Sequence, residues 1–219
     1  MLSIKNLFRL VMLVCLLLVI TAALGLFFQG EGTTRFVTAL DGHQVELLNR
    51  GTYANHSILR ATSYMGADLT IMIIVVPLLL VSSYVSKKSS KSLMILCGGL
   101  MIAFYYSISL AFGAAFNPYF LLYTVLFAVS GFAFANALGL LIKTSRSWII
   151  TQTKNVSTVI FLIIAGLSAL VWLTLIIPTF FSGDYSAFID VNTTEPTFAL
   201  DIGIVFPLFM VIAYALHQK

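Results

Sequence analysis

Six long apolar runs, separated by short polar or basic stretches, are the feature that most constrains this chain of 219 residues. They cover residues 7–28, 69–85, 93–115, 119–142, 156–180 and 199–215. Each is near the ~20 residues that an α-helix needs to cross a bilayer. Only 9% of the residues are charged, whereas soluble domains carry roughly 25%. We therefore predict an all-α bundle of six transmembrane helices, forming one integral membrane domain over residues 1–219.

The positions of lysine and arginine predict the orientation of this bundle. If the N-terminus is cytoplasmic, nine of the twelve basic residues lie on the cytoplasmic side. These are Lys5, Arg9, Lys87, Lys88, Lys91, Lys143, Arg146, Lys154 and Lys219. The excess follows the positive-inside rule and places both termini in the cytoplasm. The outer loops are then 29–56 and 181–198, and all eight acidic residues fall on the outer side.

The first apolar run also starts like a secretory signal peptide, because Lys5 and Arg9 precede it. It continues from Leu10 to Phe28, which is longer than the roughly 7–15 apolar residues of a cleaved signal. We interpret it as a retained transmembrane helix. Cys15 and Cys97 lie within apolar runs, so the sequence predicts no disulfide framework.

The first outer loop contains a predicted β-hairpin. Residues 34–40 and 43–49 flank Asp41-Gly42, a pair typical of two-residue hairpin turns. A two-residue turn would place Phe36 opposite Leu47 and Thr38 opposite Val45. After the hairpin, Ser57 is a predicted N-cap, which would extend the second helix over residues 57–85.

The second and sixth helices share a weak internal likeness. Asp68 precedes a Pro-Leu-Leu-Leu segment at Pro77, and Asp201 precedes Pro-Leu-Phe-Met at Pro207. The Asp-to-Pro spacing is nine residues in one helix and six in the other, so both duplication and coincidence stay open. Both acids lie near or inside the predicted outer edge of the apolar layer, where a carboxylate either faces a functional cavity or caps a helix start.

Arg60, Tyr64 and Asn117 complete the predicted site. Arg60, Tyr64 and Asp68 follow each other at intervals of four, and so form one stripe on a helix. The stripe could line an outward-facing pocket together with Asp201 and Asn117, or it could anchor the helix among lipid headgroups. Asn117, beside Pro118, also suits a turn, and the cluster from Tyr105 to Tyr123 is typical of an interfacial aromatic belt. Asn136 suits a hydrogen bond between helices.

No sequence pattern supports catalysis or a bound cofactor. His43 and His56 match no metal-ligand spacing, and we find no nucleophile motif, P-loop or dinucleotide fingerprint. We therefore predict no metal, no cofactor, no catalytic residues and no nucleic-acid partner.

Several segments resemble a family of small multi-pass membrane proteins predicted in many prokaryotes. The residues that carry the resemblance are 51–53 (Gly-Thr-Tyr), Ser57, Asp68, 77–82, Tyr105, Tyr106, 111–113, 116–121, 200–201 and Pro207. The resemblance implies a prokaryotic cell membrane and no particular reaction. Asp68, Asn117 and Asp201 coincide with positions that look typical of this family, so the resemblance implies that their presence is not due to chance.

Three functions remain open from the sequence. The first is transport or small-ligand binding through the outward pocket. The second is an accessory or assembly subunit that contacts a protein partner or a second copy of the chain within the lipid bilayer. The third, a membrane-embedded enzyme, is disfavoured because the titratable groups supply no nucleophile–base pair.

Overall fold

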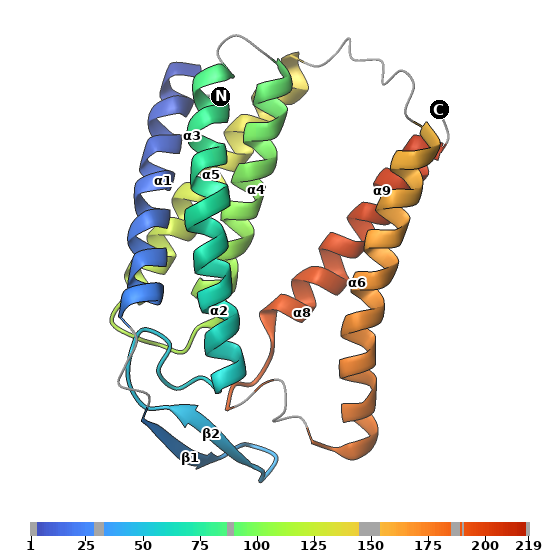
Figure 1. Cartoon of the computed structure of the whole chain (residues 1–219). Coiled ribbons are helices and arrows are strands. Elements are labelled where there is room, and N and C mark those ends of the chain that lie inside the picture. The colour runs from blue at the N-terminus through green and yellow to red at the C-terminus, as the bar shows by residue number, and fades with distance from the viewer. Residues whose placement is uncertain are drawn as a thin grey trace. The chain divides into compact units, whose positions relative to one another are not determined.

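The computed structural model of this chain describes residues 4–28, 33–86, 90–144, 154–184, 189 and 191–217. These parts are mostly helical, with a small two-stranded sheet (Figure 1). Six helices among them are long and apolar enough to cross a membrane, which supports a multi-pass membrane protein. The orientation of the helices in the membrane stays a prediction.

The chain forms two compact units. The first contains residues 1–36 and 46–147, and the second contains residues 37–45 and 148–219. In the first unit, four spans pack around one core: α1 (Ile4–Phe27), the continuous helix of α2 (Ile58–Thr70), η1 (Ile71–Val75) and α3 (Val76–Val85), α4 (Ser90–Gly113) and α5 (Phe120–Thr144). We call the end of this unit where α1 ends and α2 begins its hairpin end.

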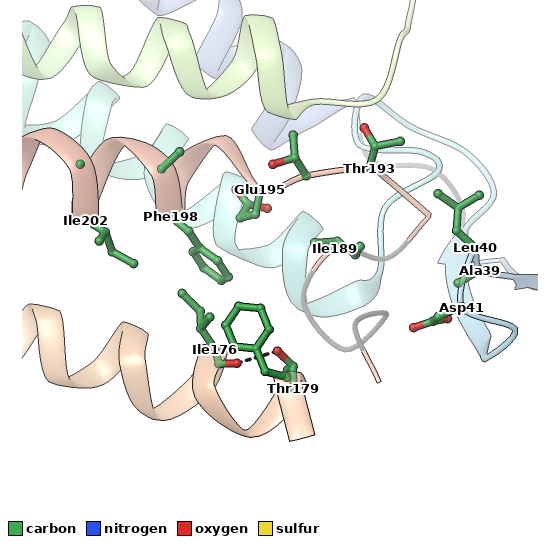
Figure 2. A pocket seen from close by; sticks show the side chains of 14 residues that line it. Ala39, Leu40, Asp41, Ile176, Thr179, Ile189, Thr193, Glu195, Phe198 and Ile202 are labelled. Atoms are coloured by element: carbon green, nitrogen blue, oxygen red, sulfur yellow. Dashed lines mark hydrogen bonds between the residues drawn. The ribbon is translucent and has the colours of Figure 1, made fainter. Parts of the chain in front are cut away.

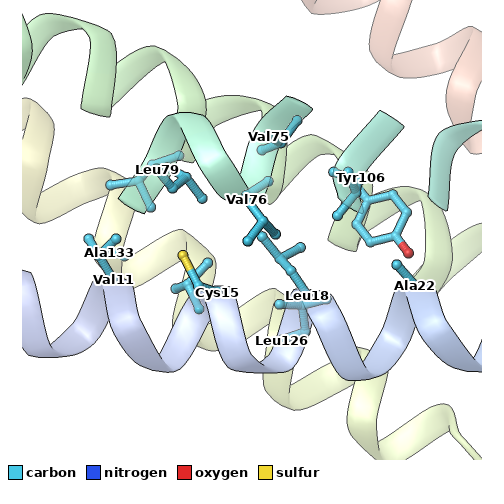
Figure 3. Packing of buried hydrophobic residues seen from close by; sticks show 14 of the residues in the cluster. Val11, Cys15, Leu18, Ala22, Val75, Val76, Leu79, Tyr106, Leu126 and Ala133 are labelled. Carbon is cyan, nitrogen blue, oxygen red and sulfur yellow. The ribbon is translucent and has the colours of Figure 1, made fainter. Parts of the chain in front are cut away.

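The core of the first unit is apolar along most of its length (Figure 3). Leu18 of α1 and Leu79 of α3 are fully buried there, as is Leu126 of α5. Tyr106 of α4 belongs to this core, and its hydroxyl donates to the buried Asp68. The tyrosine hydroxyl therefore reaches the interior of the unit, and the predicted aromatic belt is wrong for Tyr106, which is buried.

The start of the second span and its change of helical hydrogen bonding both follow from the sequence. The Ser57 side chain accepts a hydrogen bond from the backbone N–H of Arg60, which confirms the predicted N-cap. In the π-helix η1, the N–H of Val76 bonds the carbonyl of Ile71, five residues earlier. Pro77 follows directly and cannot donate a helical hydrogen bond, so the widened turn lies where the α-helical ladder is interrupted anyway.

The hairpin forms, but its turn differs from the prediction. Strands β1 (Thr34–Thr38) and β2 (Gln44–Leu48) pair, and the N–H of Ala39 bonds the carbonyl of His43. Three residues, 40–42, lie between that pair. Gly42 has a φ of 89°, which suits the left-handed residue that ends a three-residue hairpin loop.

The extra loop residue shifts the register of the strands by one. Phe36 lies opposite Glu46, so the predicted pairs Phe36–Leu47 and Thr38–Val45 are wrong. Val45 and Leu47 share the buried face of β2, whereas the Phe36 side chain is exposed. A shift of one residue exchanges the two faces of a strand, which explains why Phe36 is not part of the apolar face.

The second unit contains two spans. The first is α6 (Lys154–Ser182), and the second is a continuous helix of α8 (Pro196–Leu200), η2 (Asp201–Val205) and α9 (Phe206–His217). Here too a five-residue π-helix ends just before a proline, Pro207, and the N–H of Phe206 bonds the carbonyl of Asp201. The second and sixth predicted helices thus share a backbone feature in addition to their sequence likeness.

Candidate functional site

The site is centred on Asp68, which is 0% exposed inside the first unit. Its Oδ2 accepts a hydrogen bond of 2.6 Å from the hydroxyl of Tyr53, and its Oδ1 accepts one of 2.5 Å from the hydroxyl of Tyr106. Asp68 lies near the end of α2, and Ser57 caps the start of that helix. The alternative that Asp68 is a helix cap is therefore wrong.

Tyr53 reaches Asp68 from the loop between the hairpin and α2. The hydroxyl of Thr52 donates to the carbonyl of Leu24, and the N–H of Thr52 donates to the carbonyl of Phe28. These bonds fix the loop against the end of α1. The Tyr53 ring stacks on Tyr64 at a centroid distance of 5.1 Å. Burial raises the pKa of the Tyr53 hydroxyl, with Tyr106 and then Asp68 adding to the effect, so Tyr53 is a neutral phenol.

Gly25 of α1 permits the close approach of the carboxyl group. A Cβ atom at this position would lie 1.8 Å from Oδ2 of Asp68 and 2.7 Å from the hydroxyl of Tyr53. Any other L-residue at position 25 would displace one of these groups. The glycine is thus needed for space.

No cation neutralises the Asp68 carboxyl group among the described residues. Its two hydrogen-bond donors are neutral phenols, and the ion pairs found in the described parts of the chain involve other acids. A buried carboxylate without a counter-charge is costly, so it must be neutralised by a proton or by a bound cation. This makes Asp68 the strongest candidate for chemistry in the first unit.

A pocket of about 190 Å³ lies at the hairpin end of this unit. Gly25 and Tyr53 both line it, so the two groups that contact Oδ2 of Asp68 also form part of the pocket wall. Asp68 itself is not in the lining. Arg50 and Thr62 are polar residues of the pocket lining. Tyr53 therefore separates a small pocket from a buried carboxyl group.

The predicted stripe on α2 packs against protein. The hydroxyl of Tyr64 donates to the carbonyl of Ser109 at 3.3 Å, and the guanidinium of Arg60 donates to the carbonyl of Gly113 at 3.0 Å. Together with Asp68, these side chains face the α4 side of the unit. The geometry therefore favours the interior placement over headgroup anchoring.

His56 lies next to this stripe and is almost fully buried. Its Nε2 accepts a hydrogen bond of 2.8 Å from the N–H of Ala115, and its Nδ1 has no partner within the described parts of the chain. Burial lowers the pKa of His56 to about 3, and the charge of Arg60 adds to this effect. The imidazole is therefore neutral, with its proton on Nδ1.

Asn117 holds the turn between α4 and α5, as predicted. Its Oδ1 accepts from the N–H of Tyr119, and its Nδ2 donates to the carbonyl of Thr52 at 3.1 Å. Nδ2 also lies 3.4 Å from the hydroxyl of Tyr123, which is buried and so does not belong to the predicted aromatic belt. Asn136 donates to the carbonyl of Phe132 in its own helix, and the hydrogen bond predicted between helices stays a prediction.

Asp201 belongs to the second unit. Its Oδ2 accepts a hydrogen bond of 2.8 Å from Nε1 of Trp172 on α6. Glu195, not Asp201, caps the start of α8, so the helix-cap alternative is wrong here too. Because Asp68 and Asp201 lie in different units, their convergence on one pocket stays a prediction.

The second unit has a larger pocket of about 920 Å³ (Figure 2). Ile176, Phe198 and Ile202 point toward one another there, and the lining is mostly apolar. In the same unit, side-chain ligand atoms of Asp41, His43 and Asp184 lie within 4.8 Å of one another. The sequence predicted no metal site, and nothing in the spacing of these residues could have signalled the cluster, because Asp184 is far along the chain.

No protein-family model, curated protein or solved structure matches this chain. The resemblance to a prokaryotic membrane-protein family therefore stays a prediction.

Sequence reasoning selected Asp68 but missed Gly25, Tyr53 and Tyr106 as its neighbours. Gly25 lies in an apolar run and carries no signal of its own. Tyr53 was noted only among the residues of the resemblance, and Tyr106 both there and in the predicted aromatic belt. That they stood there together with Asp68 was the one signal that could have found them.

Proposed function

We propose that this multi-pass membrane protein binds or transports a small solute at the hairpin end of the first unit. The single observation that carries this proposal is the pocket lined by Gly25 and Tyr53, the two groups in contact with Oδ2 of the buried Asp68. The positive-inside rule predicts that this end faces the outside. The pocket would then be open to solutes from the outer medium.

The lining indicates the class of solute. Arg50 and Thr62 are both part of the lining, and the guanidinium of Arg50 would pair well with a carboxylate. A volume of about 190 Å³ is below the roughly 300–1,000 Å³ of pockets for drug-sized ligands. We therefore propose a solute of a few heavy atoms that carries a carboxylate.

Thr62 and Thr70 provide a matched pair for the test. Both are exposed on α2, and each hydroxyl donates to the carbonyl four residues earlier, at 2.9 Å. Thr62 lines the pocket and Thr70 does not. Thr62→Phe should fill the pocket, whereas Thr70→Phe should leave it open.

The measurement is thermal unfolding of the purified full chain in detergent with acetate, lactate, glycine or alanine. We expect at least one of these probes to raise the melting temperature of the wild type and of Thr70→Phe, and to have no effect on Thr62→Phe. Equal responses of all three proteins, or no response of the wild type to any probe, would contradict the proposal.

An accessory role is supported by one different observation. Only 6% of the most apolar stretch of α6 is buried within the chain. Lipid can cover such a helix, and so can another protein or a second copy. Co-purification of a stoichiometric partner from native membranes in mild detergent would favour the accessory role over solute binding.

A further inference from the structure

We propose that Asp68 is a proton-exchanging carboxyl group that gives up and takes back its proton through the pocket at the hairpin end, with Tyr53 as the movable barrier between them. This inference rests on the proposed function, because it assigns a role to the same pocket. It adds that Asp68 exchanges a proton when a solute binds in the pocket or passes through it.

The packing around Asp68 favours a proton over a metal cation. A bound Na⁺ or K⁺ needs several oxygen ligands and the space to hold it, as hard cations do generally. Here both carboxylate oxygens are already occupied by tyrosine hydroxyls. On the α1 side, the position of a Cβ at Gly25 would be only 1.8 Å from Oδ2, so no cavity is left there. A proton needs no additional volume.

The groups that face Asp68 are neutral on every element packed against it. Tyr53 comes from the loop, Tyr106 from α4 and Tyr123 from α5, and α1 contributes Gly25. The nearest basic residue on the same helix is Arg60, two turns away, where it donates to a carbonyl of Gly113 at the end of α4. The carboxyl group of Asp68 is therefore surrounded by neutral phenols, with no charged side chain among the described groups that face it.

Tyr53 is the barrier that best fits the geometry. It is 2% exposed, it contacts Oδ2, and it also lines the pocket, whereas Tyr106 contacts Oδ1 and does not line it. Displacement of Tyr53 would bring the pocket into contact with the carboxyl group. No covalent step is involved, and the proton passes between Asp68 and water or solute in the pocket.

Thr21 supplies a second, independent observation. Its hydroxyl is buried and has no hydrogen-bond partner within the described residues. Thr21 precedes Gly25 by four residues on α1, so it lies on the same face, one turn farther from the hairpin end. A buried hydroxyl without a partner indicates a place where a water molecule, and with it a proton, can be held.

The test is infrared difference spectroscopy of the full chain in lipid nanodiscs. We expect the wild type to show the carbonyl-stretch band of a protonated carboxylic acid, which shifts in D₂O and is absent from Asp68→Asn. Asn is close to Asp in shape; its carbonyl oxygen can accept from one tyrosine hydroxyl and its NH₂ group can donate to the oxygen of the other, so this variant should fold. Asp201→Asn, in the second unit, should retain the band.

The rate of hydrogen–deuterium exchange of that band tests the barrier. Tyr53→Ala should speed the exchange roughly tenfold or more, a change in barrier of about 1.4 kcal/mol. Tyr106→Ala removes an equivalent hydrogen bond but should have a much smaller effect. If the alanine variants do not fold, Tyr53→Phe should still speed the exchange, because it removes the hydrogen bond that holds the ring at Oδ2 of Asp68, and Tyr106→Phe should have a much smaller effect.

Three results would overturn the inference. One is the absence of an Asp68-dependent acid band at every pH at which the protein is folded. Another is an equal effect of the Tyr53 and Tyr106 variants on the exchange rate. The third is stabilisation by Na⁺ or K⁺ at constant pH that disappears in Asp68→Asn, since this would show a metal cation. If carboxylate probes still stabilise the protein in any of these cases, the proposed function stands and only the proton role fails.

Discussion

Gly25→Ala is the substitution whose consequence follows most directly from the structure. The new methyl group would lie 1.8 Å from Oδ2 of Asp68 and 2.7 Å from the hydroxyl of Tyr53, so at least one of these groups must move. Overpacking of a core costs about 1–3 kcal/mol. The loss of one hydrogen bond adds about 0.5–1.5 kcal/mol. We therefore expect Gly25→Ala to lower the free energy of unfolding by roughly 1.5–4.5 kcal/mol.

Gly66→Ala is the control for this prediction. Gly66 lies on α2, close to Asp68 in sequence, and a Cβ there meets no atom within 4 Å. Alanine is favoured over glycine in a helix by about 0.5–1 kcal/mol, so Gly66→Ala should be neutral or slightly stabilising. The assay is equilibrium unfolding by SDS titration from mixed micelles, followed by circular dichroism. Equal unfolding free energies for the two variants would refute the steric argument at Gly25.

Two further predictions concern the first unit. Burial lowers the pKa of His56 to about 3, against about 6.5 in the unfolded chain, so the unfolded state takes up a proton first as the pH falls below 6.5, and the free energy of unfolding decreases by about 1.4 kcal/mol per pH unit down to pH 3. His56→Gln, whose amide oxygen can replace Nε2 as the acceptor for the N–H of Ala115, should flatten this part of the pH–stability curve. An unchanged slope would contradict the conclusion that His56 is buried in its neutral form. Ser130→Ala removes the 2.9 Å hydrogen bond between Ser107 and Ser130, which joins α4 to α5, and should lower the free energy of unfolding in the SDS titration by about 0.6 kcal/mol. A double-mutant cycle with Ser107→Ala that shows no coupling energy would contradict this role of the hydrogen bond.

The helices were predictable because their cause is local. Each apolar run contains its own signal, and Ser57 marks the start of the second helix through a contact three residues away. The hairpin was predictable for the same reason, but its register was not. Asp41-Gly42 is compatible with both a two-residue and a three-residue loop, and the difference of one residue decides which face Phe36 occupies.

The surroundings of Asp68 could not be predicted, because they come from distant parts of the chain. Gly25, Tyr53 and Tyr106 are separated from Asp68 by 43, 15 and 38 positions in the sequence. The amino-acid pattern does not show which face of α4 meets α2, and Tyr106 was therefore interpreted as part of an interfacial belt. Only the packing of four spans shows that this hydroxyl is directed inward.

The comparison of Asp68 with Asp201 shows what the packing adds to a sequence pattern. Asp68 lies three residues before a five-residue π-helix, and Asp201 is the first residue of one. A proline follows in both helices, and both acids accept a hydrogen bond from an aromatic side chain. Asp68 is fully enclosed by the spans of the first unit, whereas Asp201 is only partly buried beside Trp172. The cost of an unneutralised charge rises steeply with burial. If the two helices are copies of one ancestral hairpin, both inherited the pattern. The first unit encloses its carboxyl group more completely, so the gain or loss of a proton by Asp68 must change the hydrogen bonds to the tyrosines that surround it.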